Sequence, residues 1–310
     1  MKHRSYVLTI TVAVLAIQSV FAAPQDFTIA VLPDTQHYTL KGGNGIFQQQ
    51  VAWIVSNRID RHIVCVVHVG DIVDKAANVS QWTVATNALY MLENTSLTHL
   101  ADGIPYCPSV GNHDEEPKGD SKGTDAFNLY FGTNHFAAKK YNGGHYGSNR
   151  DNHYELFSAG GMDFLVLSVA FGAVSNVLAW ADGVVKSHPA RRVIVVTHSG
   201  LTLLGHLSDQ GKALHKALKC NPNWFMLLCG HVHREARMEN VYNGHTVYSL
   251  LADYQDGPNG GNGWLRLMTF SPSNNTISVE TYSPYLDKYD TGASSAFTLK
   301  YDMQEKAEKK

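Results

Sequence analysis

The chain has 310 residues, of which 44% are hydrophobic and 17% charged, so it can form a sizeable core and is not intrinsically disordered. Its 25 lysines and arginines against 27 aspartates and glutamates give a formal charge of −2, which excludes a broad cationic surface for long nucleic acids. The 26 glycines and 10 prolines, without a fixed repeat, fit a loop-rich enzyme better than a fibrous or low-complexity protein, and the 16 histidines are more than a structural role usually needs.

Residues 1–22 have the pattern of a secretory signal peptide. Basic side chains at positions 2–4 precede a mostly apolar run, Tyr6–Ala16, and Val20-Phe21-Ala22 loosely meets the small-x-small pattern of a cleavage site. A single membrane anchor is the alternative, but the apolar run is shorter than the ~20 residues that a bilayer requires. We therefore expect a secreted or periplasmic protein with no integral membrane association after cleavage, and cleavage leaves a formal charge of −4.

The four cysteines do not form a metal-binding or redox motif. Cys65 and Cys229 lie in apolar runs, where a free thiol behaves as a small buried hydrophobe. Cys107 and Cys220 lie nearer the ends of predicted elements. An oxidising compartment would permit one or two disulfides, and the sequence does not choose a pairing.

Short apolar runs alternate with amphipathic segments from Phe27 onward. Strands are predicted at Phe27–Leu32, His62–Val69, Ile104–Val110, Asp163–Val169, Arg192–Thr197, Asn223–Cys229, Thr246–Leu251, Trp264–Phe270 and Thr276–Tyr282. Helices are predicted at Ile46–Ile59, Ser80–Glu93, Asp125–Phe131, Val174–Ser187 and Asp209–Lys219. The rest of Glu115–Arg150 is expected to be loop, and no helix is expected after position 219. Repeated strand–helix–strand units imply parallel neighbours joined by right-handed crossovers.

No linker or internal repeat divides the chain. The helix-free end of the sequence indicates that the sheets are mixed rather than purely parallel. We therefore predict one α/β domain over residues 23–299, with two packed sheets flanked by helices, followed by a charged tail over residues 300–310.

Side chains of metal-ligand type follow five predicted strands. They are Asp34 and Gln36, Asp71 and Asp74, Asn112, His113 and Asp114, His198, and finally His231 and His233. Ligands bind at the carboxyl ends of strands in open α/β sheets, so these side chains should converge. One such residue alone is usually a cap or a loop histidine, but the whole set is hard to explain without metal. A mixed oxygen and nitrogen set of about seven donors suits two divalent ions that share one carboxylate, ~3.5–4 Å apart.

The same segments resemble the successive signatures of the calcineurin-like metallophosphoesterase superfamily. These signatures are Asp34-Thr-Gln36, Gly70-Asp71-Ile-Val-Asp74, Gly111-Asn112-His113-Asp114, Val196-Thr-His198 and Gly230-His231-Val-His233. They occur in the family's order and extend from position 34 to position 233. The resemblance implies a four-layer α/β/β/α sandwich with one catalytic domain, acting as a dinuclear-metal hydrolase of phosphate esters.

The resemblance also implies a role for each residue. One ion would be held by Asp34, Gln36, Asp71 and His233, and the other by Asp71, Asn112, His198 and His231. The ions would be Mn, Zn, Fe or Mg, and a hydroxide bridging them would attack phosphorus. His113 would stabilise charge or protonate the leaving oxygen, and Asp114 would orient it.

Two positions depart from the usual pattern. Gln36 stands where the first motif normally has histidine, and His37 comes one place later. Gln36 is a neutral and weaker donor, so Gln36, His37 or water would complete this site. The Pro-Asp-Thr-Gln-x-Tyr string over positions 33–38 resembles an exported branch of the superfamily. Purple acid phosphatases require a tyrosine where Asp74 stands, so their tyrosinate-ligated chemistry is disfavoured.

The substrate is expected to be a small phosphate ester, either a monoester or a diester. A polar and aromatic segment over residues 135–153 supplies His145, Tyr146 and Arg150 as candidate substrate contacts. Arg150 would grip a phosphate oxygen or form a loop ion pair, two alternatives that the sequence leaves equal. The alternative functional hypotheses are a nucleotidase or nuclease, and a non-catalytic metal-binding scaffold with the same fold.

Overall fold

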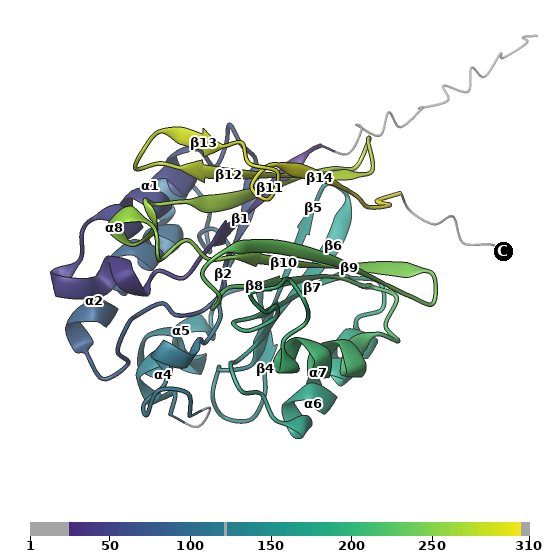
Figure 1. Cartoon of the computed structure of the whole chain (residues 1–310), viewed down its shortest axis with the longest axis horizontal. Coiled ribbons are helices and arrows are strands. Elements are labelled where there is room, and N and C mark those ends of the chain that lie inside the picture. Colours follow the sequence, from purple (N-terminus) through teal and green to yellow (C-terminus); the bar gives the residue numbers. More distant parts are fainter. Residues whose placement is uncertain (1–24, 121–122, 305–310) are drawn as a thin grey trace, which may run out of the picture.

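Two sheets of seven strands pack face to face in the computed structural model, which describes residues 25–120 and 123–304 (Figure 1). The first sheet has the order β13-β12-β11-β1-β2-β3, with β14 paired to β12. Its strands are β1 (Phe27–Leu32), β2 (Ile63–His68), β3 (Tyr106–Pro108), β11 (Leu265–Ser271), β12 (Thr276–Ser283), β13 (Lys288–Asp290) and β14 (Phe297–Lys300). The predicted signal peptide and the end of the predicted tail lie outside the described residues.

The second sheet has the order β4-β5-β6-β7-β8-β10-β9. Its strands are β4 (Asn142–His145), β5 (His153–Ala159), β6 (Met162–Val169), β7 (Arg192–Thr197), β8 (Trp224–Cys229), β9 (Glu235–Tyr242) and β10 (His245–Ala252). Strands β6, β7, β8 and β10 are parallel to one another, as are β1, β2 and β3 in the first sheet, whereas β5, β9 and β11 pair antiparallel with their neighbours. Both sheets are therefore mixed, as predicted.

Helices cover the outer face of each sheet, α1 and α2 on the first and α6 and α7 on the second (Figure 1). The helices are α1 (Ile46–Ser56), α2 (Val79–Leu89), α3 (Thr95–Thr98), α4 (Asp125–Phe131), α5 (Thr133–Phe136), α6 (Ser175–Ser187), α7 (Asp209–Leu218) and α8 (Pro258–Gly261). Short 3₁₀ turns are η1 (Gln36–Gly42), η2 (Tyr90–Glu93) and η3 (Asn112–Asp114). None of the helices in the described ranges is long and apolar enough to cross a membrane.

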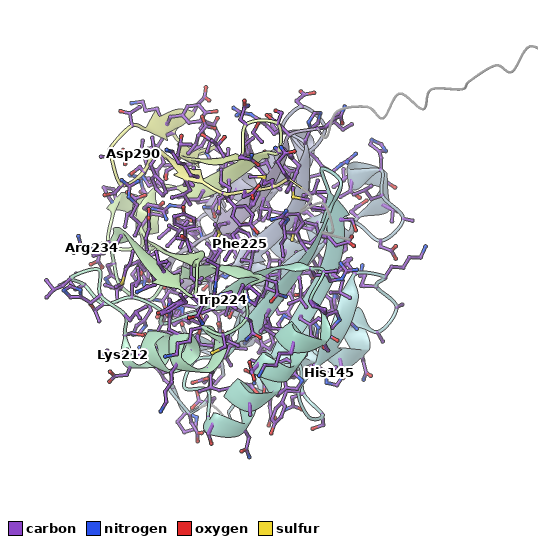
Figure 2. All side chains as sticks on the ribbon, turned by 90° about the vertical axis from the view of Figure 1, so that its right-hand side faces the viewer. His145, Lys212, Trp224, Phe225, Arg234 and Asp290 are labelled. Carbon is purple, nitrogen blue, oxygen red and sulfur yellow. The ribbon has the colours of Figure 1, made fainter. Side chains whose placement is uncertain are left out.

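Alternation of side chains along the strands builds the layers. In β1, Ala30 and Leu32 pack in the cluster beneath α1 and α2, while Ile29 and Val31 pack between the sheets. In β8, Trp224 packs toward α6 and α7 and its neighbour Phe225 packs between the sheets (Figure 2). Each of the larger aliphatic side chains and Phe225 contributes about 1.5–3 kcal/mol when it is fully buried. The predicted four-layer α/β/β/α sandwich is confirmed.

The differences from the predicted elements have simple physical causes. β4 reads Asn-Gly-Gly-His and has no apolar side chain, and β9 is a charged, partly exposed edge strand, so neither shows a hydrophobic period. β5 lies between the predicted loop region, which ends at Arg150, and the predicted strand Asp163–Val169, where no strand was predicted. The predicted first helix ends early, at Ser56, and the four-residue α8 lies in the part expected to be free of helix. All four cysteines are free thiols, and only Cys220 is exposed.

Candidate metal centre

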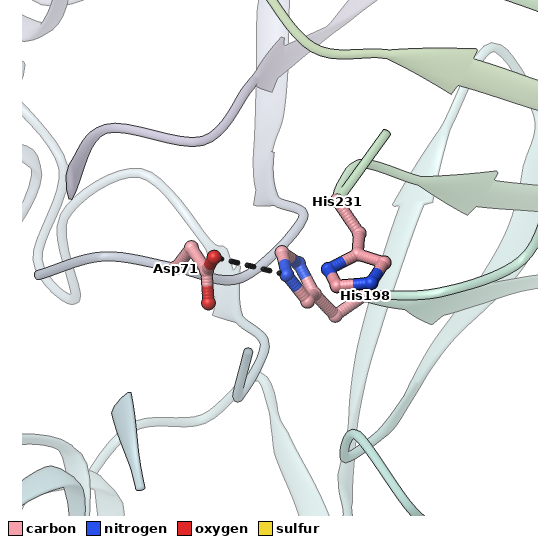
Figure 3. Close-up of side chains that lie close together, drawn as sticks. All are labelled: Asp71, His198 and His231. Carbon is pink, nitrogen blue, oxygen red and sulfur yellow. Dashed lines mark ion pairs between the residues drawn. The ribbon is translucent and has the colours of Figure 1, made fainter. Parts of the chain in front are cut away.

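Five strand ends bring predicted ligands to one edge of the two sheets. Asp34, Asp71 and Asn112 follow β1, β2 and β3, and His198 and His231 follow β7 and β8. Because these strands are parallel within each sheet, their carboxyl ends lie at the same edge. Candidate ligand atoms of Asp71, His198 and His231 lie within 4.8 Å of one another, and Figure 3 shows Asp71 facing the two histidines.

Asp71 uses both carboxylate oxygens, one within its own sheet and one toward the second sheet. Its Oδ1 accepts the backbone N–H of His113 at 2.8 Å, and its Oδ2 lies 3.1 Å from His198 Nε2. Burial opposes ionisation of this carboxyl group, but His198 and His113 together outweigh burial and lower the pKa of Asp71. The backbone at Asp71 is left-handed, with φ of 51°, and a Cβ on Gly111 would lie 2.2 Å from the Asp71 nitrogen. The fold therefore accepts backbone strain to hold this carboxylate.

Asp34 is a second buried carboxylate at the same edge. Its Oδ2 accepts the backbone N–H of His231 at 3.0 Å, whereas its Oδ1 has no hydrogen-bond partner among the described residues. Burial, followed by the negative charges of Asp253 and Asp71, raises the pKa of Asp34 well above its usual range. A buried carboxylate oxygen without a partner is costly, so this position is suited to a cation.

Two amide oxygens and an imidazole add further donors. Gln36 Oε1 and Asn112 Oδ1 are buried and, within the described ranges, also lack hydrogen-bond partners. Burial, together with the nearby His198, lowers the pKa of His231 to about 4, so this imidazole is neutral at pH 7. Unpaired oxygens and a neutral imidazole are the donors that divalent ions take in proteins. The residues present therefore fit the metal ions that the sequence predicts.

His233 lies at the outer margin of this group. Its side chain is 40% exposed, and its Nδ1 lies 2.6 Å from Asp256 Oδ2. Its Nε2 lies 3.9 Å from Oδ2 of the buried Asp253. A carboxylate on one ring nitrogen commonly orients a histidine whose other nitrogen binds metal.

His113 lies beside the ligand group on η3. Its Nδ1 is 2.7 Å from the Asp74 carbonyl oxygen and 3.4 Å from Asp74 Oδ1, and its Nε2 contacts the ammonium of Lys118. Asp114, expected to orient this ring, instead accepts backbone N–H groups of Gly111, Ile72 and Val73 at 2.9–3.2 Å. The structure thus corrects the sequence-based expectation, because Asp74 contacts the imidazole and Asp114 holds two loops together.

Asp253 and Gln255 were missed in the sequence. They follow β10, which is parallel to β8, so they reach the same edge, and they are 2% and 3% exposed. Gln255 Nε2 lies 3.0 Å from Asp253 Oδ2 and 3.4 Å from Asp34 Oδ2. A polar Asp-Tyr-Gln-Asp string directly after an apolar strand was the available signal, the same one that identified the other five strand ends.

Arg150 does not line the site. Its side chain is fully buried, forms an ion pair with the buried Glu155 and stacks 3.5 Å above the centre of the Phe136 ring. His153 Nδ1 binds the Arg150 carbonyl oxygen at 2.7 Å. Of the two alternatives that the sequence leaves for Arg150, the structure shows the ion pair, which lies in the core rather than in a loop. The predicted contact between Arg150 and a phosphate oxygen is wrong.

Replacing Arg150 with alanine should destabilise the fold rather than weaken substrate binding. The change leaves Glu155 as a buried charge without its partner, which costs about 3–5 kcal/mol. Denaturant unfolding monitored by fluorescence gives the free energy of unfolding. The double change Arg150→Met, Glu155→Leu should restore much of the lost free energy of unfolding, since the double change removes both charges. A raised KM with unchanged stability in Arg150→Ala would instead return Arg150 to the substrate site.

His145 is the last residue of the edge strand β4, and Tyr146 follows it. His145 is exposed and is labelled in Figure 2, and its Nδ1 lies 3.1 Å from the carbonyl oxygen of Gly147. The Tyr146 ring packs 5.7 Å from the ring of Trp180 on α6. The contacts that the structure gives these two side chains are therefore within their own loop and on an outer helix. Their predicted contact with substrate gains no support from them.

Comparison with known proteins gives a family and a fold. A family model described as calcineurin-like phosphoesterase matches residues 27–235. The uncharacterized protein YvnB of Bacillus subtilis (strain 168) is 37% identical over 297 residues. That match covers 91% of this chain but only 22% of the relative, so the chain spans about a fifth of the length of that protein.

Solved structures agree on the architecture. The purple acid phosphatase PPD1 from yellow lupin (Lupinus luteus) seeds superposes with a TM-score of 0.57 at 14% identity, covering 90% of this chain and 54% of that one. A dimetal phosphatase from Danio rerio superposes with a TM-score of 0.54 at 14% identity, covering 89% of this chain and 99% of that one. At this identity the likeness establishes the shared fold.

Proposed function

Because this chain belongs to the calcineurin-like phosphoesterase family, we propose that it is a metal-dependent hydrolase of small phosphate esters. The observation that carries the proposal is the set of buried, unpartnered oxygens on Asp34, Gln36 and Asn112. They lie at the edge where Asp71, His198 and His231 converge, beside the partly exposed His113. A merely structural polar cluster would pair its own oxygens.

Two groups of residues would hold the ions. Asp34, Gln36, Asp71 and His233 form the first group, and Asp71, Asn112, His198 and His231 form the second. Bound there, two divalent ions would lower the pKa of a water molecule and polarise a phosphoryl oxygen. The first group is richer in oxygen and the second is richer in imidazole, so the two sites need not hold the same metal.

His113 is suited to proton transfer at the substrate. The Asp74 carbonyl oxygen is an acceptor only, so the proton stays on Nδ1 and Nε2 is the nitrogen that exchanges protons. Nε2 is also the nitrogen that the Lys118 ammonium contacts, so one cationic group lies at this point. We propose that His113 protonates the leaving oxygen and that Lys118 attracts the phosphate. Lys118 would then supply the cationic contact first expected from Arg150.

The substrate is proposed to be small. A formal charge of −4 after removal of residues 1–22 gives long nucleic acids no general electrostatic attraction. Nucleotides remain candidate substrates, because they need only the phosphate contacts of the site. A non-catalytic scaffold has no use for His113 with its proton fixed by Asp74, and this contact favours an enzyme. We further propose export, from the signal-peptide pattern of residues 1–22.

Hydrolysis of p-nitrophenyl phosphate and bis(p-nitrophenyl) phosphate tests the proposal. Metal-stripped protein should be inactive, and added Mn²⁺, Zn²⁺, Fe²⁺ or Mg²⁺ should restore turnover. The ratio of the two rates then decides between monoesters and diesters, and a nucleotide panel tests the nucleotidase alternative. Absence of turnover on all of these substrates, in protein that still binds metal, would favour the scaffold.

A further inference from the structure

A buried chain of amides and carboxylates links the end of β10 to the first group of proposed ligands. Asp253 and Gln255 are 2% and 3% exposed. Gln255 Nε2 donates to Asp253 Oδ2 at 3.0 Å and lies 3.4 Å from Asp34 Oδ2, while the Gln255 backbone N–H donates to Asp253 Oδ1 at 3.0 Å. Gln36 Nε2 in turn donates to Gln255 Oε1. The chain of hydrogen bonds therefore runs from Asp253 through Gln255 to Gln36.

The two carboxylates determine which way both amides point. When a bound cation keeps both carboxylates ionised, their oxygens only accept hydrogen bonds, so the NH₂ group of Gln255 faces Asp253 and Asp34. The Gln255 carbonyl oxygen then faces Gln36, and only the NH₂ group of Gln36 can donate to it. Gln36 Oε1 is consequently turned away from Gln255, and it is one of the buried atoms without a partner. The hydrogen-bond chain thus presents an oxygen, not a nitrogen, at the position where the family's first motif has an imidazole.

Negative charge is concentrated at the same place. The Gln255 amide nitrogen lies 3.0 Å from Asp253 Oδ2 and 3.4 Å from Asp34 Oδ2, and His198 Nε2 lies 4.0 Å from Asp34 Oδ2 and 3.1 Å from Asp71 Oδ2, so three carboxylates gather here. In the described part of the chain Asp34 Oδ1 has no hydrogen-bond partner to offset this charge. His233 Nε2, 3.9 Å from Asp253 Oδ2, is the neighbouring imidazole. Carboxylates that crowd an unpartnered oxygen are stabilised when a cation binds among them.

We propose that Asp253 and Gln255 are part of the first metal site and give it a preference for hard, oxygen-seeking divalent ions such as Mn²⁺ or Mg²⁺. Gln255 fixes the Gln36 amide with its oxygen toward the ion, and Asp253 supplies charge that the neutral Gln36 does not. The second site, with His198, His231 and Asn112, has more nitrogen and suits Zn²⁺ or Fe²⁺. This inference rests on the proposed function for the presence of a two-metal site, but metal binding tests it without any hydrolysis assay.

The competing explanation is that Asp253 only shapes its own loop, since it also accepts the Gln255 backbone N–H. In that case Asp253→Asn would lower the melting temperature of the metal-free protein and weaken all metals alike. If Asp253 serves the first site, metal-free Asp253→Asn should melt close to the parent protein, because removal of a charge near Asp34 offsets the loss of one acceptor for Gln255. Metal-free melting therefore separates the two roles.

The test titrates the metal-free full chain with Mn²⁺ by electron paramagnetic resonance and with Zn²⁺ by isothermal calorimetry. Asp253→Asn and Gln255→Leu are compared with Asp209→Asn, which removes a fully exposed carboxylate on α7. Both site variants should bind Mn²⁺ about 10- to 100-fold more weakly, the usual cost of losing a partner that orients a ligand. The tightest Zn²⁺ affinity should stay unchanged, and Asp209→Asn should behave as the parent protein.

Unchanged Mn²⁺ affinity in Asp253→Asn would overturn the inference, as would an equal loss of Mn²⁺ and Zn²⁺ with a lower metal-free melting temperature. A parent protein that hydrolyses esters while Asp253→Asn binds Mn²⁺ normally would refute this inference and leave the proposed function standing. A parent protein that binds both metals with the predicted selectivity but hydrolyses nothing would refute the proposed function and leave this inference standing.

Discussion

Replacing Asp71 with asparagine is expected to lower kcat/KM for phosphate esters by about a thousandfold or more, which is roughly 4 kcal/mol of transition-state stabilisation. Asp71 is the carboxylate that both proposed ligand groups share. Its Oδ2 lies 3.1 Å from His198 Nε2 and its Oδ1 accepts the His113 N–H. Asparagine keeps the shape of the side chain but removes its charge, so both ions should bind weakly. Steady-state kinetics and metal analysis by mass spectrometry measure the two effects together.

The Asp71→Asn change must be separated from unfolding. Circular dichroism and thermal melting of the metal-free variant should match the metal-free parent, because asparagine has nearly the same volume. His231→Ala should behave similarly, with loss of turnover in a folded protein. More than about a tenth of parental kcat/KM in metal-replete Asp71→Asn would rule out a shared carboxylate as the centre of the site.

His113→Ala should reduce kcat by about 10²- to 10⁴-fold while leaving the bound metal unchanged, because the ring transfers a proton and ligates nothing. Nε2 exchanges the proton, while Nδ1–H is held by the Asp74 carbonyl oxygen. Substrates with better leaving groups need less protonation and should lose less rate.

Neighbouring variants discriminate between roles for this loop. Asp74→Asn keeps the backbone carbonyl that binds His113, so its effect on kcat should be much smaller than that of His113→Ala. Asp114→Ala removes the acceptor of three backbone N–H groups and should lower stability and metal content together. Loss of metal in His113→Ala, in parallel with loss of rate, would show that the ring is a ligand and that its proposed role is wrong.

Much of the fold is predictable because buried strands are apolar on both faces. β1, β7 and β8 are covered by helices on one side and by the other sheet on the second side, and their predicted ranges agree with the structure to within a residue. Edge strands lack this constraint. β9 carries charges on a partly exposed surface and β4 carries two glycines, so their pairing comes from neighbouring strands rather than from their own hydrophobicity.

The site was predictable as far as each strand end carried its own signal. Asp34, Asp71, Asn112, His198 and His231 follow apolar runs, and their meeting at one edge follows from parallel pairing. The contacts between side chains from different strand ends cannot be predicted from the residues next to each of them in the sequence. Which of Asp74 and Asp114 reaches His113 depends on a turn of η3, and the orientation of the Gln36 amide depends on residues more than two hundred positions away.

Arg150 is a residue whose local sequence gives the wrong prediction of its burial. Its polar, glycine-rich surroundings in the sequence are typical of an exposed loop, yet the guanidinium is fully buried beside Glu155 and Phe136. Burial of such a group depends on one carboxylate and one ring that tertiary packing brings together. The hydrophobic periodicity of the sequence does not predict these tertiary contacts.

Turnover measured against the number of bound ions tests the central claim most directly. Metal-free protein is titrated with Mn²⁺, and separately with Zn²⁺ followed by Mn²⁺, while bound metal and hydrolysis of the better nitrophenyl ester are recorded in the same samples. The two-metal account predicts that turnover rises steeply only as the second ion binds and reaches its plateau at two ions per chain. Full turnover with one ion per chain, or turnover that does not depend on metal, would contradict it.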